Sequence, residues 1–228
     1  MKTISLLNLL YALIPLSLVY IYYVRLTNNK TEIIYATFRM VIQLLGVGYL
    51  LIYIFEEKNI VIGSLILLFM ILISTFISIR NTSNKTSTHF INIFLSILLS
   101  GVFHLILIIY FILDFDTFYE PRYVIPIAGM IFANSMNVLS LCIERFEKEL
   151  IRNDSLEKSK AIAFKSAMIP QINSFLAVGL VTLPGMMTGQ ILSGIDPLIA
   201  VRYQIMIMST ILSSAGLSMM IYFALKKN

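Results

Sequence analysis

The sequence predicts an all-α, polytopic membrane protein with about seven transmembrane helices. Hydrophobic residues make up 58% of the 228 residues, and only 13% are charged. Soluble domains carry about 25% charged residues, so this chain has too little polar material to cover a water-facing globule. Its charges stand in short clusters between apolar runs, which is typical of membrane-protein loops and does not form a nucleic-acid-binding stripe.

Seven charge-poor runs approach or exceed the length of about 20 apolar residues that a bilayer-spanning helix needs. They cover residues 3–24, 33–55, 59–79, 90–113, 123–143, 169–192 and 203–225. We interpret the first run as an uncleaved helix, because no small-residue cleavage site follows it. The connections between the runs are short, which predicts a single transmembrane domain over residues 1–228.

The distribution of Lys and Arg predicts that the N-terminus lies outside and the C-terminus in the cytoplasm, since basic loops stay inside. The side assigned to the cytoplasm holds Arg25, Lys30, Arg80, Lys85, Arg145, Lys148, Arg152, Lys158, Lys160, Lys165, Lys226 and Lys227. The opposite side holds Lys2, Lys58, Arg122 and Arg202. This asymmetry fits an odd number of spans.

The longest polar segment is 144–165, between the fifth and sixth runs. Its charges alternate in sign, and Glu144–Lys148 and Asp154–Lys158 have the i,i+4 spacing that supports a helix. One interpretation is a solvated helical extension of the neighbouring spans. The other is a cytoplasmic docking element, with Glu144, Arg145, Glu147, Lys148 and Arg152 as the candidate docking residues.

Arg39 is a charged residue within the second run, and such residues are functional candidates by default. Tyr35, Arg39, Gln43 and Gly46 recur at helical spacing and predict one polar, narrow face. We expect Arg39 and Gln43 to line or gate the cytoplasmic mouth of a substrate pathway. The alternative is that Arg39 extends to the lipid headgroups.

The fifth run carries amide and hydroxyl groups well inside the membrane, in PIAGMIFANSMN (126–137). Asn134 and Asn137 are candidate pathway residues. The alternative is helix packing through interhelical hydrogen bonds, which is common in membranes.

The sixth run contains a Pro-Gly pair, after which the chain turns polar without gaining a charge before Asp196. A bilayer tolerates irregular backbone only where protein or a water-filled cavity surrounds it, so the pair predicts a transport pathway. Met186, Met187, Thr188 and Gln190 are candidate pathway residues, and Pro184, Gly185 and Gly189 are candidate gate or hinge residues. Alternatively, Gly185 and Gly189 form a packing motif, and Thr188 and Gln190 satisfy freed carbonyls.

Several enzyme classes lack their required residues. The last run has no lysine for the Schiff base of a retinal protein, and the aspartates lie in loops, whereas an intramembrane aspartyl protease needs two within its spans. No GxxxxGK[ST] phosphate loop for ATP hydrolysis is present. His104 is expected to be a satisfied polar group, and no cluster of carboxylates or cysteines around Cys142 marks a metal site. We therefore expect no enzyme activity and no cofactor in this chain, and the metal ligands stay unknown.

Three segments resemble the motifs of the FetB-type permease family. LPGMMTGQILSGIDPLIAVRYQ (183–204), preceded by IPQINSFLAVGLV (169–181), resembles its signature, and 126–137 and FRMVIQLLGVGYLL (38–51) resemble two further motifs. The chain departs from the family in having Ala133 in place of glycine and a shorter, more charged segment after the fifth run. The family includes bacterial iron-export ABC permeases and plant aluminium-tolerance membrane proteins.

The resemblance implies a permease subunit of an ABC-type exporter that moves metal, iron in bacterial members, out of the cytoplasm. It implies a homodimer of permeases paired with a separate cytoplasmic ATPase that binds ATP and Mg. The protein would act in the cell membrane, in contact with lipid and without nucleic acid. The alternatives are a permease for a non-metal solute such as a sugar nucleotide, and a membrane scaffold that transports nothing.

Overall fold

The computed structural model describes residues 4–56, 59–152 and 155–226, and within these ranges it contains helices and no β-strand. The predicted all-α class is confirmed. The contacts divide the chain into two compact units, Met1–Glu56 and Glu57–Asn228. The expectation of a single domain stays a prediction, and each unit is described by itself.

The N-terminal unit is a helical hairpin. It consists of α1 (Leu6–Leu10), α2 (Leu13–Thr27) and α3 (Glu32–Glu56). Asn28, at φ 56°, ends α2 in the left-handed conformation that asparagine tolerates. The side chain of Asn29 then accepts hydrogen bonds from the backbone N–H groups of Thr31 and Glu32 at 3.2 Å. None of the described side chains of α2 and α3 is buried, so their apolar surfaces are available to lipid or to protein.

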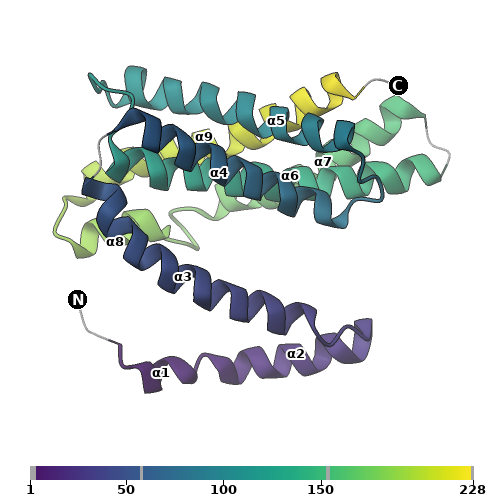
Figure 1. Ribbon diagram of the computed structural model, residues 1–228, viewed down its shortest axis with the longest axis horizontal. Helices are drawn as coiled ribbons and strands as arrows, with labels where there is room; N and C mark the ends of the chain where they lie inside the picture. The colour runs from purple at the N-terminus through teal and green to yellow at the C-terminus, as the bar shows by residue number, and fades with distance from the viewer. Residues whose placement is uncertain (1–3, 57–58, 153–154, 227–228) are drawn as a thin grey trace. The chain divides into compact units, whose positions relative to one another are not determined.

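The C-terminal unit is a helical bundle. Its elements are α4 (Ile60–Ser78), a 3₁₀ turn η1 (Ile79–Asn81), α5 (Ser87–Ile106) with a π-helical extension η2 (Leu107–Ile112), α6 (Pro121–Ile151), α7 (Leu156–Ala177), α8 (Gly185–Leu192) and α9 (Pro197–Leu225). Most buried side chains belong to α4, α5, α6 and α9, and the core is aliphatic with a few aromatic rings. Figure 1 shows α6 and α7 as adjacent arms of a hairpin.

Six helices among the described residues are long and apolar enough to span a membrane, not the seven that the sequence predicted. They are 7–27, 32–56, 60–78, 87–112, 121–151 and 197–225. The predicted sixth span, 169–192, is the one that is not among them. Its residues belong to α7, to α8 and to the irregular segment between them. The first half of α7 carries charged side chains, and too few apolar residues follow before the helix ends at Ala177.

Helix α6 packs against its neighbours through small residues. The ring of Tyr119 covers Gly63 on α4, the ring of Phe132 covers Gly101 on α5, and Met70 on α4 lies against Gly129. Across α5 and α9, Ser100 Oγ donates a hydrogen bond to the carbonyl of Ser214 at 2.9 Å. Close helix approach therefore rests on glycines and hydroxyls, as is usual in membrane bundles.

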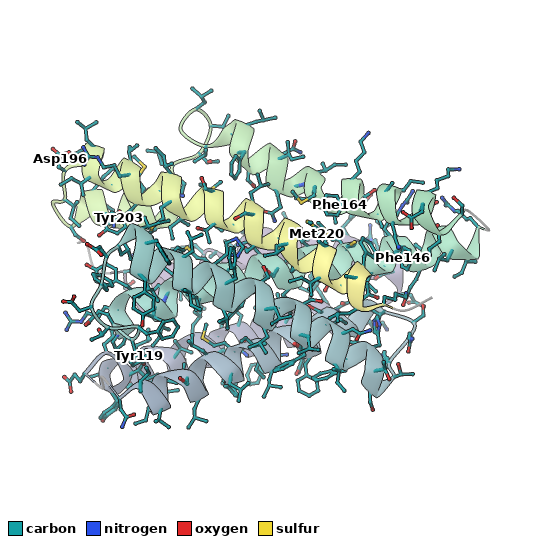
Figure 2. The ribbon with its side chains drawn as sticks, turned by 90° about the horizontal axis from the view of Figure 1, so that it is seen from above. Tyr119, Phe146, Phe164, Asp196, Tyr203 and Met220 are labelled. Carbon is teal, nitrogen blue, oxygen red and sulfur yellow. The ribbon has the colours of Figure 1, made fainter. Side chains whose placement is uncertain are left out.

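Helices α6 and α9 run parallel. Near their C-terminal ends, the rings of Phe146 and Phe223 lie 5.3 Å apart and Lys226 Nζ lies 4.3 Å from the centre of the Phe146 ring. Figure 2 shows Tyr119 and Asp196, which precede the two helices, at the opposite end of the bundle from Phe146. Because parallel helices start at the same end, the chain must return along the bundle between them. It makes this return through α7, an irregular segment and α8.

Candidate substrate pathway

The return between α6 and α9 is interrupted at Val178–Pro184, which we call the break segment. Gly179 adopts φ 83°, a conformation that favours glycine, and its N–H donates a hydrogen bond to the carbonyl of Thr182 at 2.9 Å. The N–H groups of Leu180, Val181 and Thr182 all approach the carbonyl of Ala177, at 2.8–3.2 Å. These contacts close a tight turn at the end of α7.

The position of the break differs from the prediction. The sequence placed it at Pro184-Gly185, whereas the chain leaves the helix at Val178. Pro184 is the N-cap of α8 and Gly185 is the first helical residue. Proline has no backbone N–H group, which does no harm at the start of a helix, where that group would have no intrahelical partner. The Pro-Gly pair here begins a helix and does not kink one. The assignment of Pro184, Gly185 and Gly189 as a gate or hinge stays a prediction.

Two cavities border the break segment. One, of about 310 Å³, lies among α7, α8 and α9, and the other measures about 410 Å³. Val178, Pro184 and Met208 line both. None of the residues that line them is charged. The irregular backbone thus borders two cavities with uncharged linings. Membrane proteins tolerate non-helical backbone where it is buried in protein or lines a cavity.

Gln204 on α9 lines the cavity of about 310 Å³, and its side chain is 6% exposed. Its Oε1 atom is buried and accepts no hydrogen bond from the residues that the structure describes. A buried amide oxygen without a donor is costly, by about 1–3 kcal/mol, so such groups are rare in structural cores. Gln204 Oε1 is therefore an acceptor that the described residues leave unused, on a residue that lines this cavity.

The four candidates on α8 separate into different environments. Met187 lines the same cavity as Gln204, whereas Met186 packs against the hydrophobic core. The Thr188 hydroxyl donates to the carbonyl of Pro184 at 3.0 Å, as the alternative interpretation expected. Gln190 Oε1 is buried and finds no donor among the described groups. Only the side-chain NH₂ group of Gln190 could donate to a freed carbonyl.

A methyl group added at the Cα atom of Gly185 or Gly189 would face open space within the C-terminal unit. No heavy atom among the described residues lies within 4 Å of either position. The packing interpretation of this pair therefore finds no partner helix in that unit.

Asn134 and Asn137 on α6 face α7. Asn134 donates to the carbonyl of Met130 at 2.8 Å and accepts from Gln171 Nε2 at 3.3 Å. Asn137 is exposed and lines a groove of about 520 Å³ that lies between the end of α4, α6 and α7. Asn134 thus forms an interhelical hydrogen bond, which is the packing role given above as the alternative to a pathway role. Asn137 instead lines the groove.

Arg39 and Gln43 lie on α3 in the N-terminal unit. The helix is continuous through both, so Tyr35, Arg39, Gln43 and Gly46 share one face, as their spacing predicted. Arg39 is half-buried and Gln43 is exposed within that unit. Their place at a cytoplasmic mouth stays a prediction.

The predicted docking segment consists of the end of α6 and the start of α7. Glu144 pairs with Lys148 at 2.6 Å, and the buried Glu149 pairs with Arg145 at 2.7 Å and Arg152 at 3.3 Å. Glu147 Oε2 accepts from the backbone N–H of Ser83 at 2.8 Å, which ties the α4–α5 loop to α6. This geometry agrees with a solvated helical extension. The predicted Asp154–Lys158 pair lies outside the described residues.

His104 is a satisfied polar group, as expected. Its Nδ1 lies 2.7 Å from the Ser100 carbonyl and its Nε2 lies 2.8 Å from Ser213 Oγ. Among the described residues, no three His, Cys, Asp or Glu side chains gather closely enough to hold a metal ion. Any cation in the pathway would meet amide, hydroxyl, thioether and carbonyl groups, which include weak ligands for transition metals.

Sequence reasoning missed Gln171, Gln204 and Arg80 as site residues. Gln171 and Gln204 stand inside or beside the motif that was recognised, but polarity alone does not distinguish them from neighbouring polar residues. Arg80 was counted only as a loop charge, whereas it lines the groove with Asn137 and Gln171. The sequence does not show which helices contact one another, and these three residues become site candidates only through such contacts.

The described part of the chain contains six apolar helices of membrane-spanning length. The protein is therefore a multi-pass α-helical membrane protein. The chain belongs to the family described as "Uncharacterised protein family (UPF0014)", whose model matches residues 4–228. The predicted family and the multi-pass membrane location are thereby confirmed.

Three relatives carry informative names. The "UPF0014 membrane protein YjkA" of Bacillus subtilis is 35% identical, over 84% of this chain and 81% of its own. The "Probable iron export permease protein FetB" of Escherichia coli is 34% identical, over 84% and 78%. The "Protein ALUMINUM SENSITIVE 3" of Arabidopsis thaliana is 30% identical, over 82% and 72%. No solved structure matches the chain.

Proposed function

We propose that this chain is the permease subunit of an ABC-type exporter that moves metal, iron in particular, out of the cytoplasm. The observation that carries the proposal is the uncharged break segment between two parallel helices, with a buried, unpartnered Gln204 in the cavity beside it. Irregular backbone at membrane depth marks substrate sites in transporters. The choice of iron rests on the printed name of the Escherichia coli relative.

In the proposed assembly the permease forms a homodimer in the cell membrane. A separate cytoplasmic ATPase binds ATP and Mg and performs the hydrolysis, so the permease itself is not an enzyme. The hairpin of α6 and α7 is the proposed docking element, because its helices extend beyond the apolar part of the bundle and carry exposed charges. Movement of this hairpin would reach the break segment through α7.

Iron efflux from cells tests the transport proposal. Bacterial cells lacking their own iron exporter would be loaded with radioactive iron and then supplied with the parent protein, Asn137→Ala, Gln190→Ala or Gln204→Ala. We expect the parent to restore efflux and each variant to lower the rate, by about tenfold where a hydrogen bond in the pathway is lost. Met220→Ala, at a side chain that is 59% exposed on α9, is the control.

Two results would contradict the proposal. One is a parent protein that leaves cell iron unchanged at normal expression. The other is parental efflux by all three pathway variants. Docking has its own test, which is copurification of a small ATPase with a phosphate-loop motif and its loss when residues 144–165 are replaced by a neutral helical linker.

A further inference from the structure

Two methionines line the cavity of about 310 Å³ beside the break segment. Met187 belongs to α8 and Met208 to α9, and both residues are half-buried. Met208 also lines the neighbouring cavity of about 410 Å³. Because α8 and α9 contact each other, two helices bring two thioether sulfur atoms, which can act as metal ligands, to one cavity.

Oxygen atoms on residues at this cavity are left without hydrogen-bond donors. Gln204 lines the cavity, and its buried Oε1 atom accepts no hydrogen bond from the residues that the structure describes. No described backbone N–H donates to the carbonyls of Val178 and Gly179, two further lining residues. In transporters the carbonyls of unwound segments coordinate cations. The lining residues thus supply thioether sulfur and uncharged oxygen.

The lack of charge around the cavity limits which cation it can hold. None of the described residues that line it carries a charge. The cost of removing an ion from water rises with the square of its charge, so a divalent ion costs about four times as much as a monovalent ion of the same size. No carboxylate in the lining compensates that cost. The cavity therefore favours a monovalent ion over a divalent or trivalent one.

The ligand atoms narrow the choice further. Thioethers select soft ions such as Cu⁺, whereas Mg²⁺ and Ca²⁺ prefer carboxylate, carbonyl and water oxygens. We infer that this cavity binds a soft monovalent cation, with Cu⁺ as the cargo and Met187 and Met208 as its sulfur ligands. The inference rests on the proposed function for transport but not for binding, and it adds a second class of metal to the proposed iron cargo.

Cu⁺ binding to the full-length protein in lipid nanodiscs tests the inference. Cu⁺ is supplied without oxygen as its complex with a coloured chelator, so that transfer to the protein is read from the loss of colour. Even outer-shell partners of a metal change its affinity by about 10- to 100-fold, so Met187→Leu and Met208→Leu should each weaken binding at least about tenfold. Leucine keeps the volume and apolar character of methionine, so both variants should fold.

Two control variants and one spectrum locate the ion. Met220→Leu makes the same change at a side chain that is 59% exposed on the helix of Met208, and it should bind like the parent. Cys142→Ala removes the one thiol of the chain and should also bind like the parent. X-ray absorption at the copper edge should report sulfur neighbours in the parent and fewer of them in each variant at Met187 or Met208.

Three results would overturn the inference. The double variant Met187→Leu/Met208→Leu binds Cu⁺ as tightly as the parent, or Fe²⁺ binds the parent as tightly as Cu⁺, or Cys142→Ala alone abolishes binding. Copper tolerance of bacterial cells that lack their own copper exporters tests Cu⁺ as cargo. The parent should raise the tolerance and the double variant should not, and no gain from the parent would refute the assignment.

The iron-efflux assay separates this inference from the proposed function. If the parent binds Cu⁺ through both methionines but exports no iron, the soft-metal site stands and the proposed iron cargo falls. If the parent exports iron and the two substitutions leave Cu⁺ binding unchanged, iron export stands and the soft-metal site falls.

Discussion

The side-chain amide of Gln171 donates a hydrogen bond to the side-chain oxygen of Asn134 at 3.3 Å, across the hairpin of α6 and α7. Gln171 is buried and Asn134 is half-buried, so neither is fully open to solvent. This contact fixes the register of the two helices beside the groove.

We expect Asn134→Ala and Gln171→Ala to be coupled. In membranes such interhelical hydrogen bonds contribute about 0.6–1.7 kcal/mol. The double variant should therefore lose less unfolding free energy than the sum of the two single variants, and the difference should equal this contribution. Reversible unfolding in mixed detergent measures the four free energies. Asn173→Ala, at an exposed residue two positions closer to the break segment, should add independently.

Gln204→Leu should separate stability from function. The buried Oε1 atom of Gln204 has no donor among the described residues, so its replacement by an apolar group removes a penalty of about 1–3 kcal/mol. We expect the thermal midpoint to stay level or rise while iron efflux falls. A large drop in the midpoint together with normal efflux would mean that Gln204 has a structural role only.

Gly101→Ala should destabilise the bundle. A methyl group at this position would collide with the ring of Phe132, and overpacking of a buried contact costs about 1–3 kcal/mol. Gly46→Ala on α3 is the matched control, because no described atom lies within 4 Å of the added methyl and alanine favours a helix. Thermal unfolding compares the two, and adding Phe132→Leu to Gly101→Ala should recover stability if the ring is the cause.

Glu144 and Glu149, two of the acidic residues near the end of α6, should differ in their contribution to stability. Glu149 is 3% exposed and accepts charge-assisted bonds from the more exposed Arg145 and Arg152, so Glu149→Ala should lower the unfolding free energy by about 1–3 kcal/mol. Glu144→Ala breaks a pair in which the Lys148 side chain is 60% exposed, and we expect a change below about 1 kcal/mol. Equal effects in chemical unfolding would contradict the assigned difference in burial.

The class of the fold could be predicted from composition and from the spacing of apolar runs, because a bilayer demands long uncharged helices. The break was predicted as well, but at Pro184-Gly185 and not at Val178. Prolines interrupt helices and also begin them, and which applies depends on the preceding turn, here the left-handed Gly179. Six described helices, and not seven, are long and apolar enough to span a membrane, because the residues of the predicted sixth span are divided among α7, the break segment and α8.

The site could be predicted only in part. Asn137 and Met187 line cavities, whereas the Thr188 hydroxyl donates to the carbonyl of Pro184 one turn earlier and Met186 packs against the core. Burial of Gln204 and the place of Arg80 at a groove depend on contacts between helices that are distant in sequence. Polar residue types alone do not reveal such contacts.

The break segment divides the return path into two helical parts that share a neighbour. Up to Ala177 the chain is bound to α6 through Gln171, and both α7 and α8 contact α9. A displacement of the α6–α7 hairpin at the predicted cytoplasmic end would therefore reach α8 by two routes. One is torsion in the residues from Val178 to Pro184, and the other is the surface of α9, which with Gln204 lines the cavity between them.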